Sequence, residues 1–103
     1  MNITEKIDKY LNESKQKGDI VKVVKYKGEL QLKVKGMSQY IKVGDMVEFK
    51  DTENVRKKDF GPGASGFIRK INKSGTVTVE ANTLKRENVK KVVTIDDIHW
   101  TMD

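Results

Sequence analysis

The sequence predicts a mainly β protein, in which a small antiparallel barrel follows a helix and a β-hairpin. Apolar and polar residues alternate with period two in several segments after residue 20, as they do in half-buried strands. Residues that form turns, mostly Gly, Asn and Asp, separate these segments. The 103 residues suit one small domain, with the helix and hairpin in residues 1–42 and the barrel in residues 43–103.

The first element expected is a short amphipathic helix near residues 3–16. Ile3, Ile7 and Leu11 recur at helical spacing and would share one face. Gly18 follows the last turn, as is typical of the end of a helix. A helix of this length is marginal alone, so it is expected to cover the core or to engage a partner.

Residues 20–35 predict the β-hairpin. The second arm, Leu30–Val34, alternates apolar and polar side chains, and Lys27-Gly28 supplies a tight turn. The first arm is rich in β-branched residues but changes phase between Val23 and Val24, which predicts a bulge there.

From residue 43 the pattern predicts only strands and the turns between them. Strands are expected at residues 46–50, 66–71, 76–80 and 89–95, and Ile98 and Trp100 close the sequence. Residues 39–43, just before, fit either a short strand or a connection. Asn72–Gly75 predicts a type I turn, and Val77 and Val79 are expected to point inward.

A long loop is expected at residues 51–66, charged at first and then rich in glycine. With little apolar burial to hold it, such a loop is predicted to be mobile alone and to become ordered when a polyanion or a protein binds. The competing interpretation is an ordered loop that packs on the barrel through Phe60, with its charges idle.

The net charge of +6 is concentrated in two segments. Residues 22–42 carry +5 and residues 56–91 carry +7, whereas residues 43–55 and 92–103 carry −3 each. Such clustering favours a face that binds polyanions. The alternative is an ordinary lysine-rich surface in contact with solvent.

Two basic groups are candidates for the binding site. One is the loop around Lys57, where glycines allow close backbone approach to a phosphate and Phe60 offers a ring for stacking. The other follows the predicted strands, with Phe67 near it but expected in the core. The candidate nucleic-acid-binding residues are Arg56, Lys57, Lys58, Phe60, Arg69, Lys70, Lys73, Lys85, Arg86, Lys90 and Lys91.

Several function classes are not expected. The chain has no cysteine, which excludes disulfides, zinc–thiolate sites and a thiol nucleophile. Asp96, Asp97 and His99 could form a metal or acid–base site, but a polar turn with Ile98 and Trp100 packed is favoured. No catalytic residue, metal or cofactor is therefore predicted. No apolar run is long enough to span a membrane and no signal peptide is recognised, so a cytoplasmic protein is expected.

Residues 43–95 resemble the KOW-type, SH3-like barrel of NusG-type transcription factors and some large-subunit ribosomal proteins. The matching segments are Val43–Val47, Gly63–Ile71 and Thr76–Glu80 with the following Ala81–Arg86. The resemblance implies an SH3-like barrel that binds nucleic acid. Phe67 departs from it, because family members commonly carry a basic residue at this position, and residues 1–42 have no counterpart.

The leading functional hypothesis is a small, basic, non-enzymatic barrel that binds RNA or DNA mainly through phosphate contacts. The second is a protein-interaction module, docking through the N-terminal helix or the strand edges, such as a phage- or plasmid-encoded modulator of a host complex. The third is a structural accessory, for example a virion component. A shared fold does not decide between these functions.

Overall fold

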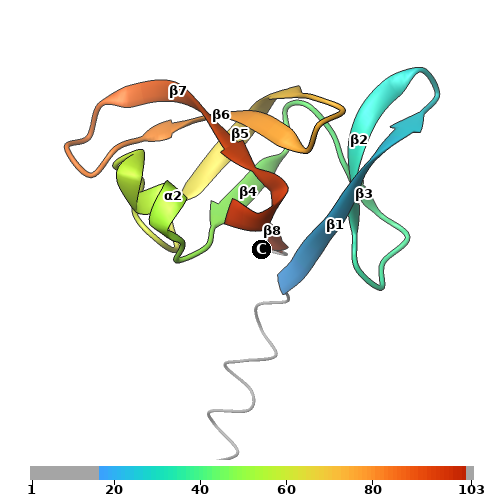
Figure 1. Ribbon diagram of the computed structural model, residues 1–103, viewed down its shortest axis with the longest axis horizontal. Coiled ribbons are helices and arrows are strands. Elements are labelled where there is room, and N and C mark those ends of the chain that lie inside the picture. The colour runs from blue at the N-terminus through green and yellow to red at the C-terminus, as the bar shows by residue number, and fades with distance from the viewer. Residues whose placement is uncertain (1–16, 102–103) are drawn as a thin grey trace, which may run out of the picture.

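The computed structural model describes residues 17–101, which form eight strands, one short α-helix and one 3₁₀ turn. None of the helices in this part of the chain is long and apolar enough to cross a membrane. The helix predicted near residues 3–16 lies outside the described residues. The elements in chain order are β1 (Lys17–Tyr26), β2 (Glu29–Val34), β3 (Tyr40–Ile41), β4 (Met46–Phe49), α2 (Glu53–Lys57), β5 (Ser65–Ile71), β6 (Thr76–Asn82), β7 (Asn88–Thr94), η1 (Ile95–Asp97) and β8 (Ile98–Thr101) (Figure 1).

The eight strands form one antiparallel sheet in the order β3-β2-β1-β8-β4-β5-β6-β7. The predicted mainly β fold is confirmed. Strand β4 pairs with β5 on one side and with β8 on the other, so the last strand returns beside the first strand of the segment after residue 43. The strand order ends at β3 and at β7, and closure of the sheet into a barrel stays a prediction.

The predicted hairpin is confirmed as β1 and β2, which project to one side of the molecule in Figure 1. Lys27 and Gly28 connect them with φ angles of 51° and 82°, the backbone of a tight turn that matches the twist of the strands. Leu32 and Val34 point inward and are completely buried, as their alternation predicts.

The predicted bulge in β1 is wrong in its position. The register shifts between Ile20 and Lys22 rather than between Val23 and Val24. The physical reason is a change of partner, because β1 pairs with β8 as far as Asp19 and with β2 from Ile20 onward. Alternation along one strand does not reveal which neighbour each part of the strand has.

The strands after residue 43 begin and end within two residues of the predicted bounds. Val77 and Val79 are fully buried, as expected. The turn between β5 and β6 is also as predicted, since the Gly75 amide donates to the Asn72 carbonyl at 3.1 Å. The ambiguous segment 39–43 contains the two-residue strand β3.

The loop expected at residues 51–66 is held by apolar burial, contrary to the premise of the mobile-loop prediction. It contains α2, whose first turn begins as the Val55 amide donates to the Thr52 hydroxyl at 3.2 Å. Val55 and Phe60 are both 0% exposed, and the Phe60 ring stacks on Phe49 with centroids 4.4 Å apart. The structure therefore favours the competing interpretation of a packed loop.

One hydrophobic cluster joins the hairpin to the rest of the sheet. Strands β1, β2 and β3 contribute to it together with β4, β5, β6, β7 and β8, and α2 and Phe60 cover one side. Its buried members are Ile20, Leu32, Val34, Ile41, Val47, Phe49, Val55, Phe60, Ile68, Ile71, Val77, Val79, Ala81, Val93 and Ile98. The hairpin is therefore anchored by its inner face, which leaves its outer face to solvent.

Replacing Phe60 with Ala is expected to destabilise the protein by about 3–5 kcal/mol, because it removes a buried ring from the core. Urea unfolding followed by Trp100 fluorescence would measure the loss. Phe67→Ala is the matched control, since the same change at a side chain that is 46% exposed should cost about 1 kcal/mol. Equal losses in the two variants would contradict the packing of this loop.

Candidate functional site

A cleft of about 400 Å³ lies where the hairpin approaches the end of β5. Three elements form its walls: the start of β2, the connection from β3 to β4, and the last residues of β5. Three cationic side chains and one carboxylate line it beside three apolar side chains. The lining residues are Glu29, Leu30, Lys42, Val43, Arg69, Lys70 and Ile71.

Backbone hydrogen bonds bring the connection from β3 to β4 alongside β5. The Gly44 amide donates to the Ile68 carbonyl at 2.7 Å, and the Ile68 amide donates to the Asp45 carbonyl at 2.9 Å. Asp45 also accepts from the Lys42 amide at 2.9 Å through its side chain. Lys42 is thereby held at the mouth of the cleft rather than at the end of a free loop.

A bulge in β5 supplies the other two cations. The register with β6 shifts between Ile68 and Lys70, so two consecutive side chains, Arg69 and Lys70, are both exposed. Regular alternation would have turned one of them inward. The bulge therefore doubles the positive charge that this end of β5 presents to the cleft.

The cations of the cleft differ in how they are engaged. Arg69 pairs with Glu80 at 2.8 Å. Lys42 and Lys70 make no ion pair within residues 17–101. With Glu29 as the one carboxylate in the lining, the cleft carries an excess of positive charge. Such a concave cationic surface attracts anions from solution.

The two aromatic residues considered as stacking platforms differ from expectation in their burial. Phe60, expected to be exposed, is buried in the core, so its proposed platform role is wrong. Phe67, expected in the core, is 46% exposed because its neighbour Ile68 takes the inward position. The Arg69 guanidinium lies 5.6 Å from the centre of the Phe67 ring, so Phe67 is the ring beside the cationic end of β5.

The predicted basic loop has most of its groups engaged within the fold. Arg56 pairs with Asp51, and Lys57 pairs with Glu53 at 3.2 Å across one helical turn. The Lys58 carbonyl accepts a hydrogen bond from the Lys91 ammonium at 2.8 Å. Lys91 also lies 5.9 Å from the centre of the buried Phe60 ring. Lys58 and Lys91 thus fix the loop to β7.

The remaining predicted cations do not form a single stripe. Lys73 lies in the turn that follows β5, near Lys70. Lys90 is opposite Glu80, on the edge strand β7. The far end of β6 lies about 13 Å from the row of Lys70, because each residue of a strand advances about 3.3 Å, and Lys85 and Arg86 lie in the turn beyond that end. The structure therefore brings Arg69 and Lys70 together but separates them from Lys85 and Arg86.

Lys42 and Glu29 are cleft residues that the sequence analysis did not select. The one available signal was the +5 charge of residues 22–42, which includes Lys42. Sequence alone could not place Lys42 in the same cleft as Lys70, because this placement depends on how the β3–β4 connection hydrogen-bonds to β5.

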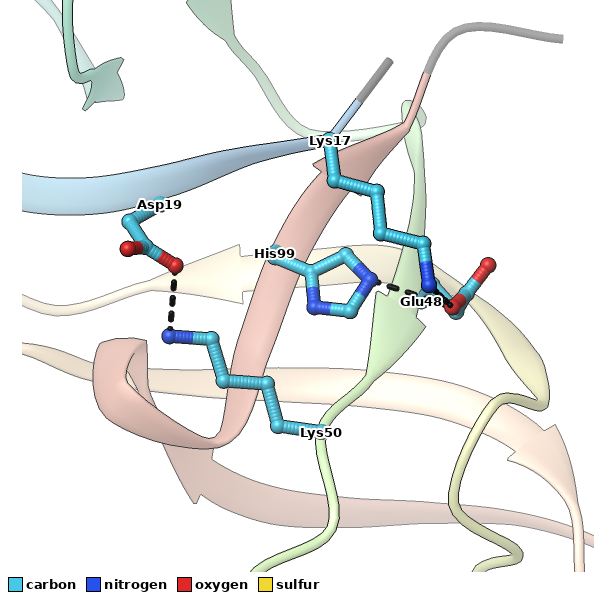
Figure 2. A network of polar contacts seen from close by, with 5 residues as sticks. All are labelled: Lys17, Asp19, Glu48, Lys50 and His99. Atoms are coloured by element: carbon cyan, nitrogen blue, oxygen red, sulfur yellow. Dashed lines mark hydrogen bonds and ion pairs between the residues drawn. The ribbon is translucent and has the colours of Figure 1, made fainter. Parts of the chain in front are cut away.

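His99 belongs to a polar network that joins β1, β8 and β4 (Figure 2). Its Nε2 lies 3.1 Å from Glu48 Oε1, which also receives the Lys17 ammonium at 3.2 Å. Nearby, Lys50 pairs with Asp19 at 2.9 Å. Burial alone would raise the pKa of Glu48, but the hydrogen bonds from Lys17 and His99 outweigh it and hold that pKa below its ordinary value.

Asp97 is the most heavily engaged carboxylate in the described part of the chain. Its oxygens accept from the Thr52 hydroxyl and the Asn54 amide, both at 2.7 Å, and from the Thr94 amide at 2.9 Å. Burial would raise its pKa, yet these hydrogen bonds together lower it below the ordinary value. Asp97 therefore ties the start of α2 to the turn before β8.

Residues 95–97 form the 3₁₀ turn η1, and His99 lies in strand β8 directly after it. Ile98 is completely buried and Trp100 packs against the core. Within residues 17–101, no group of three or more His, Asp or Glu side chains is placed to hold a metal ion.

Asp97→Asn is expected to lower the free energy of unfolding by about 1–3 kcal/mol near neutral pH, because the new amide sets a donor against donors already present. Below about pH 5 the unfolded carboxyl binds more protons than the folded one, so the wild type loses stability as pH falls. The variant should lose less stability between about pH 6 and pH 3. Thermal melting at several pH values would measure both effects.

Asp96→Asn is the control for this experiment, because Asp96 is the adjacent carboxylate and is exposed. It should keep the wild-type melting temperature near neutral pH. An acid-induced loss that is the same in the wild type and Asp97→Asn would contradict the role given to Asp97.

Comparisons of the chain with known proteins return no relative. No family model matches the sequence, and no curated protein and no solved structure is significantly similar to it. The likeness of residues 43–95 to KOW-type barrels remains an expectation from the sequence. Function is therefore inferred from the cleft and the charges around it.

Proposed function

We propose that this protein is a small non-enzymatic module that binds nucleic acid mainly through phosphate contacts, and that β4 to β8 form its SH3-like barrel. The return of β8 beside β4 supports closure of this part of the sheet. The cationic cleft is the single observation on which the binding function rests.

Three features of the cleft suit a phosphate. Lys42 and Lys70 come from different elements and face one hollow without an acidic partner among the described residues. Arg69 adds a planar donor group, which contacts phosphate oxygens in pairs. The β3–β4 connection, which carries Lys42, is hydrogen-bonded to β5, and β5 pairs with β6, so the cations need little further ordering on binding.

The cations outside the cleft favour a polymer of phosphates, and not a single small anion, as the ligand. Lys73 follows Lys70 at the next turn, and Lys22 and Lys33 lie on the outer face of the hairpin. A chain of phosphates could contact several of these groups in succession and release a counterion at each contact.

Binding of a fluorescent oligonucleotide should weaken steeply as salt is raised. The association constant is plotted against the salt concentration, both as logarithms. The three cleft cations, with one phosphate contact each, contribute a slope of about −2 on single strands and about −2.7 on duplex DNA. The triple variant Lys42→Ala, Arg69→Ala, Lys70→Ala should weaken binding to all sequences alike and reduce the slope by this amount, which leaves only the contribution of the cations outside the cleft. Fluorescence anisotropy over a salt series measures both quantities.

A matched control removes the same number of positive charges elsewhere. Lys57, Lys85 and Arg86 lie away from the cleft, on α2 and on the turn between β6 and β7. Replacing these three with Ala should leave most of the slope intact. If both triple variants lose affinity equally, net charge and not the cleft is responsible.

A protein-interaction module is the second candidate, and the ends of the sheet are the observation that favours it. β7 is an edge strand of seven residues, and β3 ends the other side. An added strand would pair with such an edge through main-chain hydrogen bonds. Partner capture that persists in high salt would support this candidate, because phosphate contacts are lost under those conditions.

A further inference from the structure

Two tyrosines, Tyr26 in β1 and Tyr40 in β3, form an exposed aromatic pair on the outer face of the three strands β1, β2 and β3. Tyr26 and Tyr40 are 48% and 39% exposed, although both are large apolar rings. Their rings stack on each other with centroids 5.9 Å apart and planes within 8° of parallel. The Lys27 ammonium lies 5.4 Å from the centre of the Tyr26 ring. The pair thus presents flat aromatic surface next to a cation.

The pair lies beside the candidate cleft. Tyr26 is the register partner of Glu29, the residue of β2 at which the cleft begins. Tyr40 precedes Lys42, another lining residue of the cleft, by two residues. A ligand that leaves the cleft over the hairpin therefore meets the two rings within one or two residues of the cleft wall.

The same outer face carries an electrostatic cost that a bound anion would remove. Lys22 is directly opposite Lys33, and Lys33 is directly opposite Tyr40. Like charges in such a pair destabilise a sheet. Neither lysine makes an ion pair among the described residues, so nothing in this part of the chain offsets the repulsion.

We propose that this face is a base-stacking platform for single-stranded nucleic acid, with bases on Tyr26 and Tyr40 and phosphates at Lys22, Lys33 and the cleft. The proposal rests on the phosphate-binding function proposed above and adds a preference for unpaired bases. Rings stack on bases of any sequence, because every base has a π face. Bases inside a duplex are stacked on one another, so exposed rings on a sheet reach only unpaired ones.

Three fluorescent probes of equal length test the proposal by anisotropy: a single-stranded oligothymidylate of about ten nucleotides, an abasic strand with the same phosphates, and a duplex. The wild type should bind the oligothymidylate about 5- to 140-fold more tightly than the abasic strand for each base stacked. Because the phosphates are equal in number, this ratio reports the bases alone.

Tyr26→Ala/Tyr40→Ala should lower the affinity for the oligothymidylate to that for the abasic strand and leave the abasic affinity unchanged. Tyr26→Phe/Tyr40→Phe keeps both rings and should keep the wild-type ratio. Tyr26→Leu/Tyr40→Leu retains apolar bulk without a π system, so it should also lose the preference, and it serves if the Ala variant unfolds. Circular dichroism melts confirm folding of each variant.

The outcomes separate this inference from the proposed function. Wild-type protein that binds the abasic strand with a salt-dependent affinity but shows no preference for bases retains the phosphate function and overturns the platform. Absence of salt-dependent binding to any probe overturns both. The platform is also overturned if the protein binds the duplex more tightly than the oligothymidylate. An acidic peptide of the same charge is an additional control, and its tighter binding would likewise overturn the platform.

Discussion

Strand β1 is the element on which the rest of the structure depends, because it belongs to both halves of the sheet. Its first residues pair with β8 and the remainder pairs with β2. Gly18 makes this crossing possible, since a Cβ at this position would collide with the buried side chain of Val34. The Lys35 amide closes the junction by donating to the Asp19 carbonyl at 2.8 Å. The placement of the hairpin beside β5, and with it the cleft, follows from this crossing.

Two buried carboxylates reinforce the fold through polar contacts, one at the β1 junction and one away from it. Glu48 joins β4 to β8 and β1 through His99 and Lys17 (Figure 2). Asp97 joins α2 to the end of β7. A carboxylate taken out of water is costly unless its oxygens are hydrogen-bonded. Here the hydrogen bonds more than offset burial, as the lowered pKa of each group indicates. Both carboxylates thereby help to fix the frame that carries the cations.

Local patterns in the sequence predicted the strands and turns but not the contacts between distant segments. The alternation of apolar and polar side chains along a strand depends only on neighbouring residues. It correctly predicted the burial of Leu32, Val34, Val77 and Val79. The burial of Phe60 was missed because glycines and charges surround it, and its partner Phe49 is in another element. The cleft was missed for a related reason, since its cations come from separate segments of the chain. Such placements are tertiary, and no periodicity encodes them.

On the hairpin, the two opposite lysines that would attract a polyanion also lower the stability of the fold. A carboxylate at either Lys22 or Lys33 would replace repulsion across the strands by attraction, yet the sequence keeps two cations there. On the proposed function, a polyanion supplies the missing negative charge. Binding and hairpin stability are then linked, because a ligand that binds the folded protein alone adds RT ln(1 + [L]/Kd) to the free energy of unfolding. On that proposal, the free hairpin is the less stable form, and relief of the repulsion between Lys22 and Lys33 contributes to the affinity.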